Sequence, residues 1–112
     1  MKMKFSIKER MLLVTTDFLV PESTTVEQLL IRGFKTMVDI PPNEVEKIGL
    51  RTDPDGMTRW NEKKEYPLEI DLTQELFDLL KKSSELLEQM GKINPDNLDF
   101  RIRINNLTFL KP

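Results

Sequence analysis

The chain has 112 residues, of which 38% are hydrophobic and 32% charged, and its formal net charge is −2. This length and composition predict one globular domain, residues 1–112, and exclude a disordered chain. Cysteine and histidine are both absent, which removes the most common catalytic bases, nucleophiles and zinc ligands and leaves only catalysis by carboxylates open. We expect a protein that is not an enzyme and uses no metal ion or cofactor.

Two helices of the N-terminal half are predicted from the residues that cap them. Ser6 and Glu9 have the spacing of a capping box, which starts a helix over about residues 7–15. Pro42 suits the first turn of a later, short helix, and Gly49 suits its end. The inward face of the first helix is expected to carry Ile7, Met11 and Val14.

A longer helix is predicted between these two. Thr24 and Glu27 form a second capping box, after which the apolar spacing continues to Val38. Gly33 in the middle costs about 1 kcal/mol relative to alanine, so close packing or a kink is expected there. The apolar residues at helical spacing in this segment are Val26, Leu30, Phe34 and Met37.

The sequence then changes from helical to alternating periodicity. The segment 53–56, Asp-Pro-Asp-Gly, is typical of a tight turn and predicts a hairpin with arms at Leu50–Thr52 and Met57–Trp60. A third strand is predicted where Tyr66, Leu68, Ile70 and Leu72 alternate with polar residues. Pro67 places it at a sheet edge. We therefore expect a three-stranded antiparallel meander from Leu50 to Leu72.

A long amphipathic helix is predicted from Leu72 to Met90, with Asp71 or Thr73 as its cap and Gly91 at its end. The segment Leu98–Ile104 alternates like a strand but follows an Asn-Pro helix start, so helix and strand both stay open there. Together these elements predict an α+β fold with a helical N-terminal half, a small meander and a long C-terminal helix. Four residues are expected in the core, namely Phe34, Leu76, Leu80 and Leu87.

The candidate partner-binding residues lie mostly in the predicted meander. Asp53 and Asp55 resemble the start of a calcium loop, but the full ligand pattern is not met, so a turn is favoured. Together with Glu69 they predict an acidic edge that would complement a basic partner. Trp60 is either a core residue or an exposed anchor for that partner.

Arg101 and Arg103 are the second candidate pair. Two guanidinium groups beside a phenylalanine suit an anion or nucleic-acid contact. The favoured interpretation is that they pair with Asp96, Asp99 or a helix carboxylate on the surface.

Nucleic-acid binding is disfavoured by charge. Residues 1–40 carry six basic and five acidic side chains, residues 41–72 carry five and eight, and residues 73–112 carry six of each. A winged-helix regulator has three helices followed by a hairpin, as predicted here, but its recognition helix would carry Glu44 and Glu46 against Lys47. Acidic elements do not approach phosphates readily. This alternative therefore ranks below protein binding.

The order of several motifs resembles a family of small accessory proteins of bacteriophages and prophages. The likeness rests on "KFSIKERMLLV", "PPNEVEKIGL", the Arg59–Asn61 "RWN", "EYPLEIDL" and "GKINPD", while the final "FRIRINNLTFLKP" departs from the helical end of that family. The family has no established activity to transfer. The resemblance implies an accessory protein that acts inside the host cell.

The leading hypothesis is accordingly a non-enzymatic phage protein of the host cytoplasm that binds another protein, such as a host or defence factor. The alternatives are a virion or assembly component, which requires self-association or a capsid or tail partner, and the nucleic-acid-binding regulator. The apolar run 11–14 is too short for a signal peptide or a membrane span, so no membrane association is expected.

Overall fold

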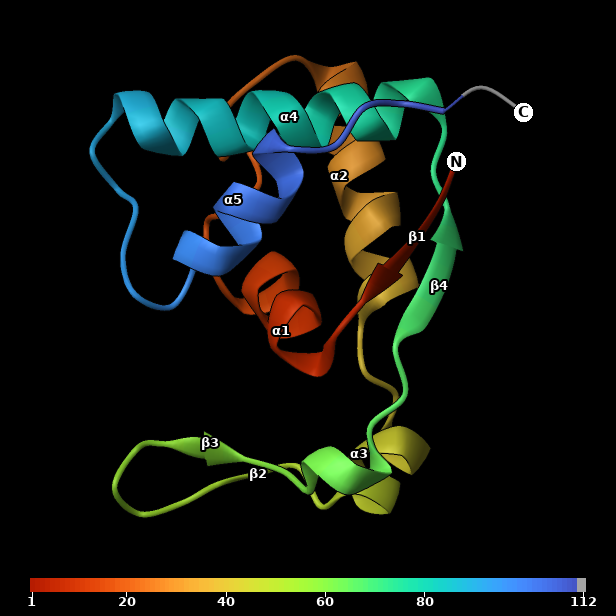
Figure 1. Cartoon of the computed structure of the whole chain (residues 1–112), viewed down its shortest axis with the longest axis vertical. Helices are drawn as coiled ribbons and strands as arrows, with labels where there is room; N and C mark the ends of the chain where they lie inside the picture. The colour runs from red at the N-terminus through yellow and green to blue at the C-terminus, as the bar shows by residue number, and fades with distance from the viewer. Residues whose placement is uncertain (111–112) are drawn as a thin grey trace.

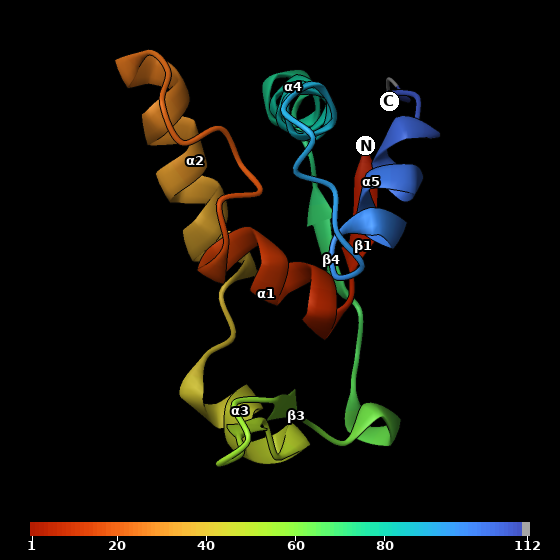
Figure 2. The same ribbon diagram turned by 90° about the vertical axis from the view of Figure 1, so that its left-hand side faces the viewer.

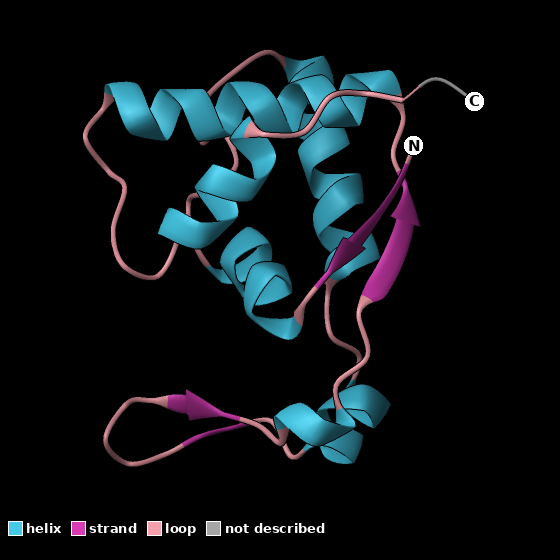
Figure 3. Cartoon of the chain, in the orientation of Figure 1, coloured by secondary structure: helices cyan, strands magenta, loops and turns pink. Residues whose placement is uncertain are grey.

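The computed structural model describes residues 1–110 and shows an α+β fold (Figures 1 and 3). Three helices follow the first strand, a hairpin and a further strand come next, and two helices end the described chain; the strands form two separate antiparallel pairs. The elements are β1 (Lys2–Phe5), α1 (Ile7–Thr15), α2 (Thr25–Val38), α3 (Pro42–Ile48), β2 (Arg51–Thr52), β3 (Thr58–Arg59), the 3-10 helix η1 (Glu62–Lys64), β4 (Leu68–Asp71), α4 (Gln74–Gln89) and α5 (Leu98–Asn105).

The larger part of the molecule, which we call the body, consists of β1, α1, α2, β4, α4 and α5. Its core is built from buried aliphatic and aromatic side chains, with the ring of Phe5 edge-on to those of Phe34 and Phe100 at centroid distances of 5.8 and 6.3 Å. Such edge-to-face pairs add to the free energy of burial. The four residues predicted to be core, Phe34, Leu76, Leu80 and Leu87, are all buried.

The predicted helix starts follow from local capping and are confirmed. Ser6 accepts a hydrogen bond from the amide of Glu9, whose carboxylate accepts one from the amide of Ser6. Thr24 caps α2 through the Glu27 amide, but the Glu27 carboxylate turns away to Lys82 on α4. Only half of the second capping box therefore forms.

The predicted meander is wrong. The hairpin β2–β3 forms as expected, and the amide of Gly56 donates to the carbonyl of Asp53 to close its turn. The third strand, β4, pairs instead with β1, so that Lys2 lies opposite Asp71. The intervening 3-10 helix separates β4 from the hairpin, and β1 presents its own buried alternate residues to the core. Tyr66 and Pro67 lie outside the strand.

The long helix is present as α4, capped by Thr73 and followed by Gly91 in the left-handed conformation. It is not the C-terminal helix, because Leu98–Asn105 forms α5. This settles the open alternative between helix and strand in favour of helix. The Asn94 side chain accepts hydrogen bonds from the amides of Asp96 and Asn97 and so orders the turn that precedes α5.

A smaller group of elements, residues 41–66, lies apart from the body in Figure 1. We call it the α3–hairpin module, since it contains α3, β2, β3 and η1. Its one buried side chain is that of Ile48. The ring of Tyr66 is exposed and lies beneath the ammonium group of Lys47, at 4.3 Å.

Candidate functional site

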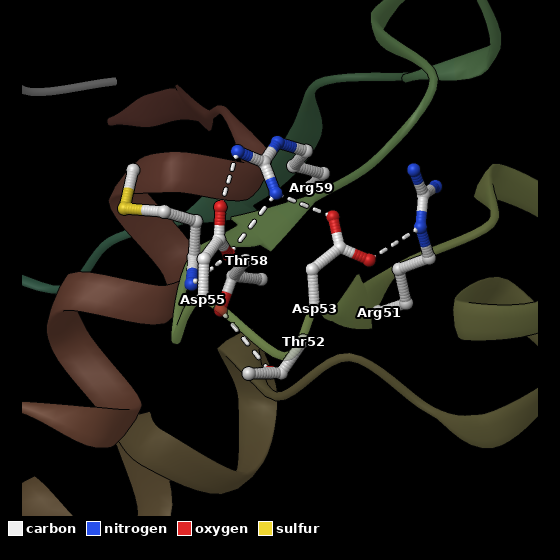
Figure 4. Close-up of polar contacts among 7 residues, drawn as sticks. Arg51, Thr52, Asp53, Asp55, Thr58 and Arg59 are labelled. Atoms are coloured by element: carbon white, nitrogen blue, oxygen red, sulfur yellow. Dashed lines mark hydrogen bonds and ion pairs between the residues drawn. The ribbon is translucent and has the colours of Figure 1, made fainter.

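The two aspartates of the hairpin turn are held by arginines of the same hairpin (Figure 4). Arg59 lies between them and binds both carboxylates, with 2.9 Å from its Nη2 to Oδ2 of Asp55, while Arg51 donates to Asp53 over 2.9 Å. The hydrogen bond from Arg59 lowers the pKa of each aspartate, and Arg51 acts in the same direction on the pKa of Asp53. The hairpin tip is therefore close to neutral as a unit.

Glu69, the third predicted acidic residue, is not brought to the hairpin. It lies on β4, in the other strand pair, and its cross-strand neighbour is Lys4. Asp71 is likewise opposite Lys2. Opposite charges at such positions stabilise a strand pair. The structure thus divides the predicted acidic edge into two places, each with basic residues beside it.

Trp60 is half-buried, which is intermediate between the two predicted states. Its indole Nε1 donates to the carboxylate of Glu65 over 3.2 Å, and the other oxygen of Glu65 accepts from the amide of Ile7 over 2.6 Å. This arrangement connects the module to the start of α1. A partner that bound Trp60 would therefore have to leave its hydrogen bond with Glu65 intact or replace it.

Arg101 and Arg103 form the ion pairs that the sequence favoured, specifically with carboxylates of other helices. Arg101 reaches Glu85 on α4 over 3.1 Å, and Arg103 reaches both oxygens of Glu9 on α1 over 2.6 Å. Arg103 also donates to the backbone carbonyl of Lys4. These arginines join α5 to the rest of the body.

A buried arginine on α1 is the polar feature that sequence reasoning missed. Arg10 is 2% exposed and donates to the carbonyls of Val38 (2.8 Å) and Asp39 (2.9 Å) and to both oxygens of Glu44 on α3 (2.7 and 3.0 Å). A signal existed, because Arg10 lies three residues after the buried Ile7 on the inward face. Met11 and Val14, predicted for that face, are only half-buried.

The side of α2 that faces solvent is the second missed feature. Val26, Leu29 and Met37 are 68%, 56% and 47% exposed, although Val26 and Met37 share the helical spacing of the buried Phe34. The residues that point inward are Ile31, Phe34 and Val38. We define the α2 outer face by the exposed residues of this helix, which are Thr25, Val26, Leu29, Arg32, Gly33, Thr36 and Met37.

The α2 outer face combines three exposed apolar side chains with two threonines and a glycine, and Arg32 is its one charged residue. Figure 2 shows α2 at the margin of the body, with no other element on its outer side. Gly33 lies in the middle of an unbroken helix, and a Cβ built on it would meet no atom within 4 Å. The predicted close packing or kink at Gly33 is therefore absent from the chain's own fold.

A cleft of about 430 Å³ between the α1–α2 connection and the end of α4 is a second candidate site, and unlike the α2 outer face it is concave. Its buried polar side chains already serve the fold. Ser83 accepts from the amide of Val20 over 3.1 Å, while the Asn97 side chain accepts from the Asn94 amide and donates to the Lys92 carbonyl. Groups committed in this way are poor recognition groups for a ligand, so the α2 outer face is the stronger candidate.

Residues 1–110 contain no cluster of three acidic, histidine or cysteine side chains arranged to hold a metal ion. No helix in the same range is long and apolar enough to cross a membrane. Comparison of the chain with protein-family models, curated proteins and solved structures finds no match.

Proposed function

We propose that this protein works by binding another protein through the α2 outer face, without catalysing a reaction itself. The observation that carries the proposal is the exposure of Val26, Leu29 and Met37 on one helix that no other element covers. Exposed apolar side chains that gather on one uncovered face mark interaction sites in monomeric proteins. In a chain with 32% charged residues, a helix face with one charge stands out.

The spacing of these side chains suits recognition of a protein. Val26, Leu29, Gly33 and Met37 follow one another at i, i+3, i+7 and i+11, which aligns them along one side of the helix for about three turns. A row of this length provides the central apolar contacts of a helix-mediated interface. The resemblance to phage accessory proteins supports a host or defence factor as the partner, met in the host cytoplasm.

Affinity capture from lysate of the host tests the proposal with four baits. The wild type is compared with Leu29→Glu/Met37→Glu, with Ile102→Glu as a matched control on α5, and with the reversal of Asp53, Asp55 and Glu69 to lysine. The six residues changed in these three variants are all exposed or half-buried. Circular dichroism verifies that each bait is folded.

We expect a protein that the wild type and Ile102→Glu retain and that the α2 double variant loses. Retention by the double variant, with loss in the lysine variant, would move the interface to the hairpin and β4. A captured protein that all four baits retain equally would contradict binding at either surface.

A further inference from the structure

We infer that the α2 outer face accepts an amphipathic helix of the partner whose flanking residues are acidic. This inference rests on the proposed function and specifies the chemistry of the partner. Three observations on α2 carry it, namely an apolar row, a glycine in the middle of that row and an arginine without a carboxylate beside it.

The arginine provides the charge argument. Each of the chain's other arginines has a carboxylate within ion-pair distance; these are Arg10, Arg51, Arg59, Arg101 and Arg103. Arg32 has no such partner among residues 1–110, nor does Lys35 one turn later on α2. Both line a shallow groove between α1 and α2 that also contains Asp39, whose carboxylate accepts a hydrogen bond from the Ile40 amide. With two basic groups and one acidic group, the groove carries a net charge of +1. A partner with carboxylates at this flank would supply the missing counter-charges.

The opposite side of α2, which carries Glu27, already has its counter-charge within the chain. Glu27 is bound there by Lys82 of α4 over 2.9 Å, and this contact lowers the pKa of the Glu27 carboxyl. The charge that α2 leaves without an internal counter-ion is therefore positive. This asymmetry selects an acidic partner segment rather than a basic one.

Gly33 indicates that the partner segment is a helix. A glycine in a helix interior costs about 1 kcal/mol relative to alanine, and nothing in this chain approaches it within 4 Å. Interaxial distances between packed helices depend on the side chains at the contact, so a glycine at that point permits a close crossing. Leu29 and Met37, one turn before and one turn after Gly33, would then contact the two sides of the crossing helix.

A second copy of this chain fits the same face less well. In an antiparallel pair of α2 helices about a two-fold axis through the middle of the helix, Arg32 would face Arg32 of the second copy. Like charges placed together disfavour association. The occupant that the charges favour is a different, acidic chain.

A displayed library of helical peptides tests this inference with a defined probe. Each peptide carries a fixed leucine row at i, i+3, i+7 spacing, and its flanking positions vary among Glu, Gln and Lys. The full-length protein is the bait, and affinities of enriched peptides are measured by fluorescence anisotropy against wild type, Leu29→Glu/Met37→Glu, Arg32→Glu, and Arg59→Glu as the control arginine.

We expect the enriched peptides to carry glutamate at their flanking positions. Arg32→Glu should bind these peptides at least about ten-fold more weakly than the wild type or Arg59→Glu does. A lysine-flanked peptide should gain affinity for Arg32→Glu. Enriched peptides that need Leu29 and Met37 but show no preference for glutamate would overturn the inference and leave the proposed function standing.

Three other outcomes would contradict an acidic helix as the occupant of the α2 outer face. Failure to enrich any peptide that depends on Leu29 and Met37 would overturn the proposed function as well. Light scattering that shows a dimer broken by Leu29→Glu would make a second copy the occupant. Binding to phosphatidylserine vesicles that Arg32→Glu abolishes would make an anionic membrane the occupant.

Discussion

In the body, four helices and a strand pair bury apolar side chains against one another, whereas the α3–hairpin module is attached through hydrogen bonds and ion pairs. The body contributes every residue of the hydrophobic cluster, and the module contributes none to it. A cleft of about 340 Å³ lies between them, lined by Met11 and Val14 of α1 and by Leu50 and Thr58 of the module.

The body is held together by apolar burial, whereas the module is positioned by hydrogen bonds. Burial is non-directional and stabilises the body in proportion to the area removed from water. The hydrogen bonds of Arg10 are directional: those to the carbonyls of Val38 and Asp39 hold the end of α2, and those to Glu44 position the module while contributing little buried apolar area. The two regions should therefore respond differently to substitution.

The largest effect is expected in the core of the body. Leu80 is 1% exposed on α4, so Leu80→Ala removes a fully buried side chain and should lower the free energy of unfolding by about 2–5 kcal/mol. Urea denaturation followed by circular dichroism measures it. The matched control is Leu29→Ala on the exposed side of α2, where the change should be within about 0.5 kcal/mol. Equal effects of the two substitutions would show that the buried and exposed faces are misassigned.

A smaller and more local effect is expected at the Arg10–Glu44 pair. Glu44→Gln removes the charge that the buried guanidinium faces and should cost about 1.5–3 kcal/mol, the range for hydrogen bonds to charged groups. Hydrogen exchange should accelerate first in residues 41–66. Glu46→Gln, at an exposed position of the same helix, is the control. Uniform acceleration across the body and the module would contradict the difference between them.

The smallest effect is expected at the exposed hairpin tip and concerns pH. The pKa of Asp53 is lowered by its hydrogen bond with Arg59, and that of Asp55 has the same first cause. Their contribution to stability is present above the ordinary aspartate pKa and is lost as the pH falls through the lowered folded-state pKa. An NMR titration of the carboxyl carbons in Arg59→Gln should show both pKa values moving upward. Unchanged titration curves would mean that Arg59 does not hold these carboxylates in solution.

What the sequence predicted correctly was local. The capping residues Ser6, Thr24 and Thr73 determine helix starts through contacts within three residues, so no knowledge of the fold was needed. The turn closed by Gly56 follows the same logic. The residues expected in the core of α4 were also found, because its apolar residues form one broad, continuous stripe.

What the sequence could not predict depends on distant partners. The strand β1 is four residues long, and its partner β4 begins only at Leu68, so its pairing leaves no local signal. In α2, apolar residues occupy both sides of the helix, so periodicity grouped the exposed Val26 and Met37 with the buried Phe34 and did not single out Ile31. The candidate site residues Asp53, Asp55, Arg101 and Arg103 proved to have partners within the chain.

The central claim is that the α2 outer face is not required for the chain's own packing, and Gly33→Ala tests it most directly. Because a Cβ at this position would meet no atom within 4 Å, the only intramolecular effect should be the better helix propensity of alanine. Gly49→Ala is the contrasting control. Gly49 has a φ of 66°, which alanine adopts only with strain, so this change should lower the free energy of unfolding. The account predicts that Gly33→Ala raises the free energy of unfolding by about 0.5–1 kcal/mol. A decrease would show that Gly33 packs against the chain itself and would contradict the claim.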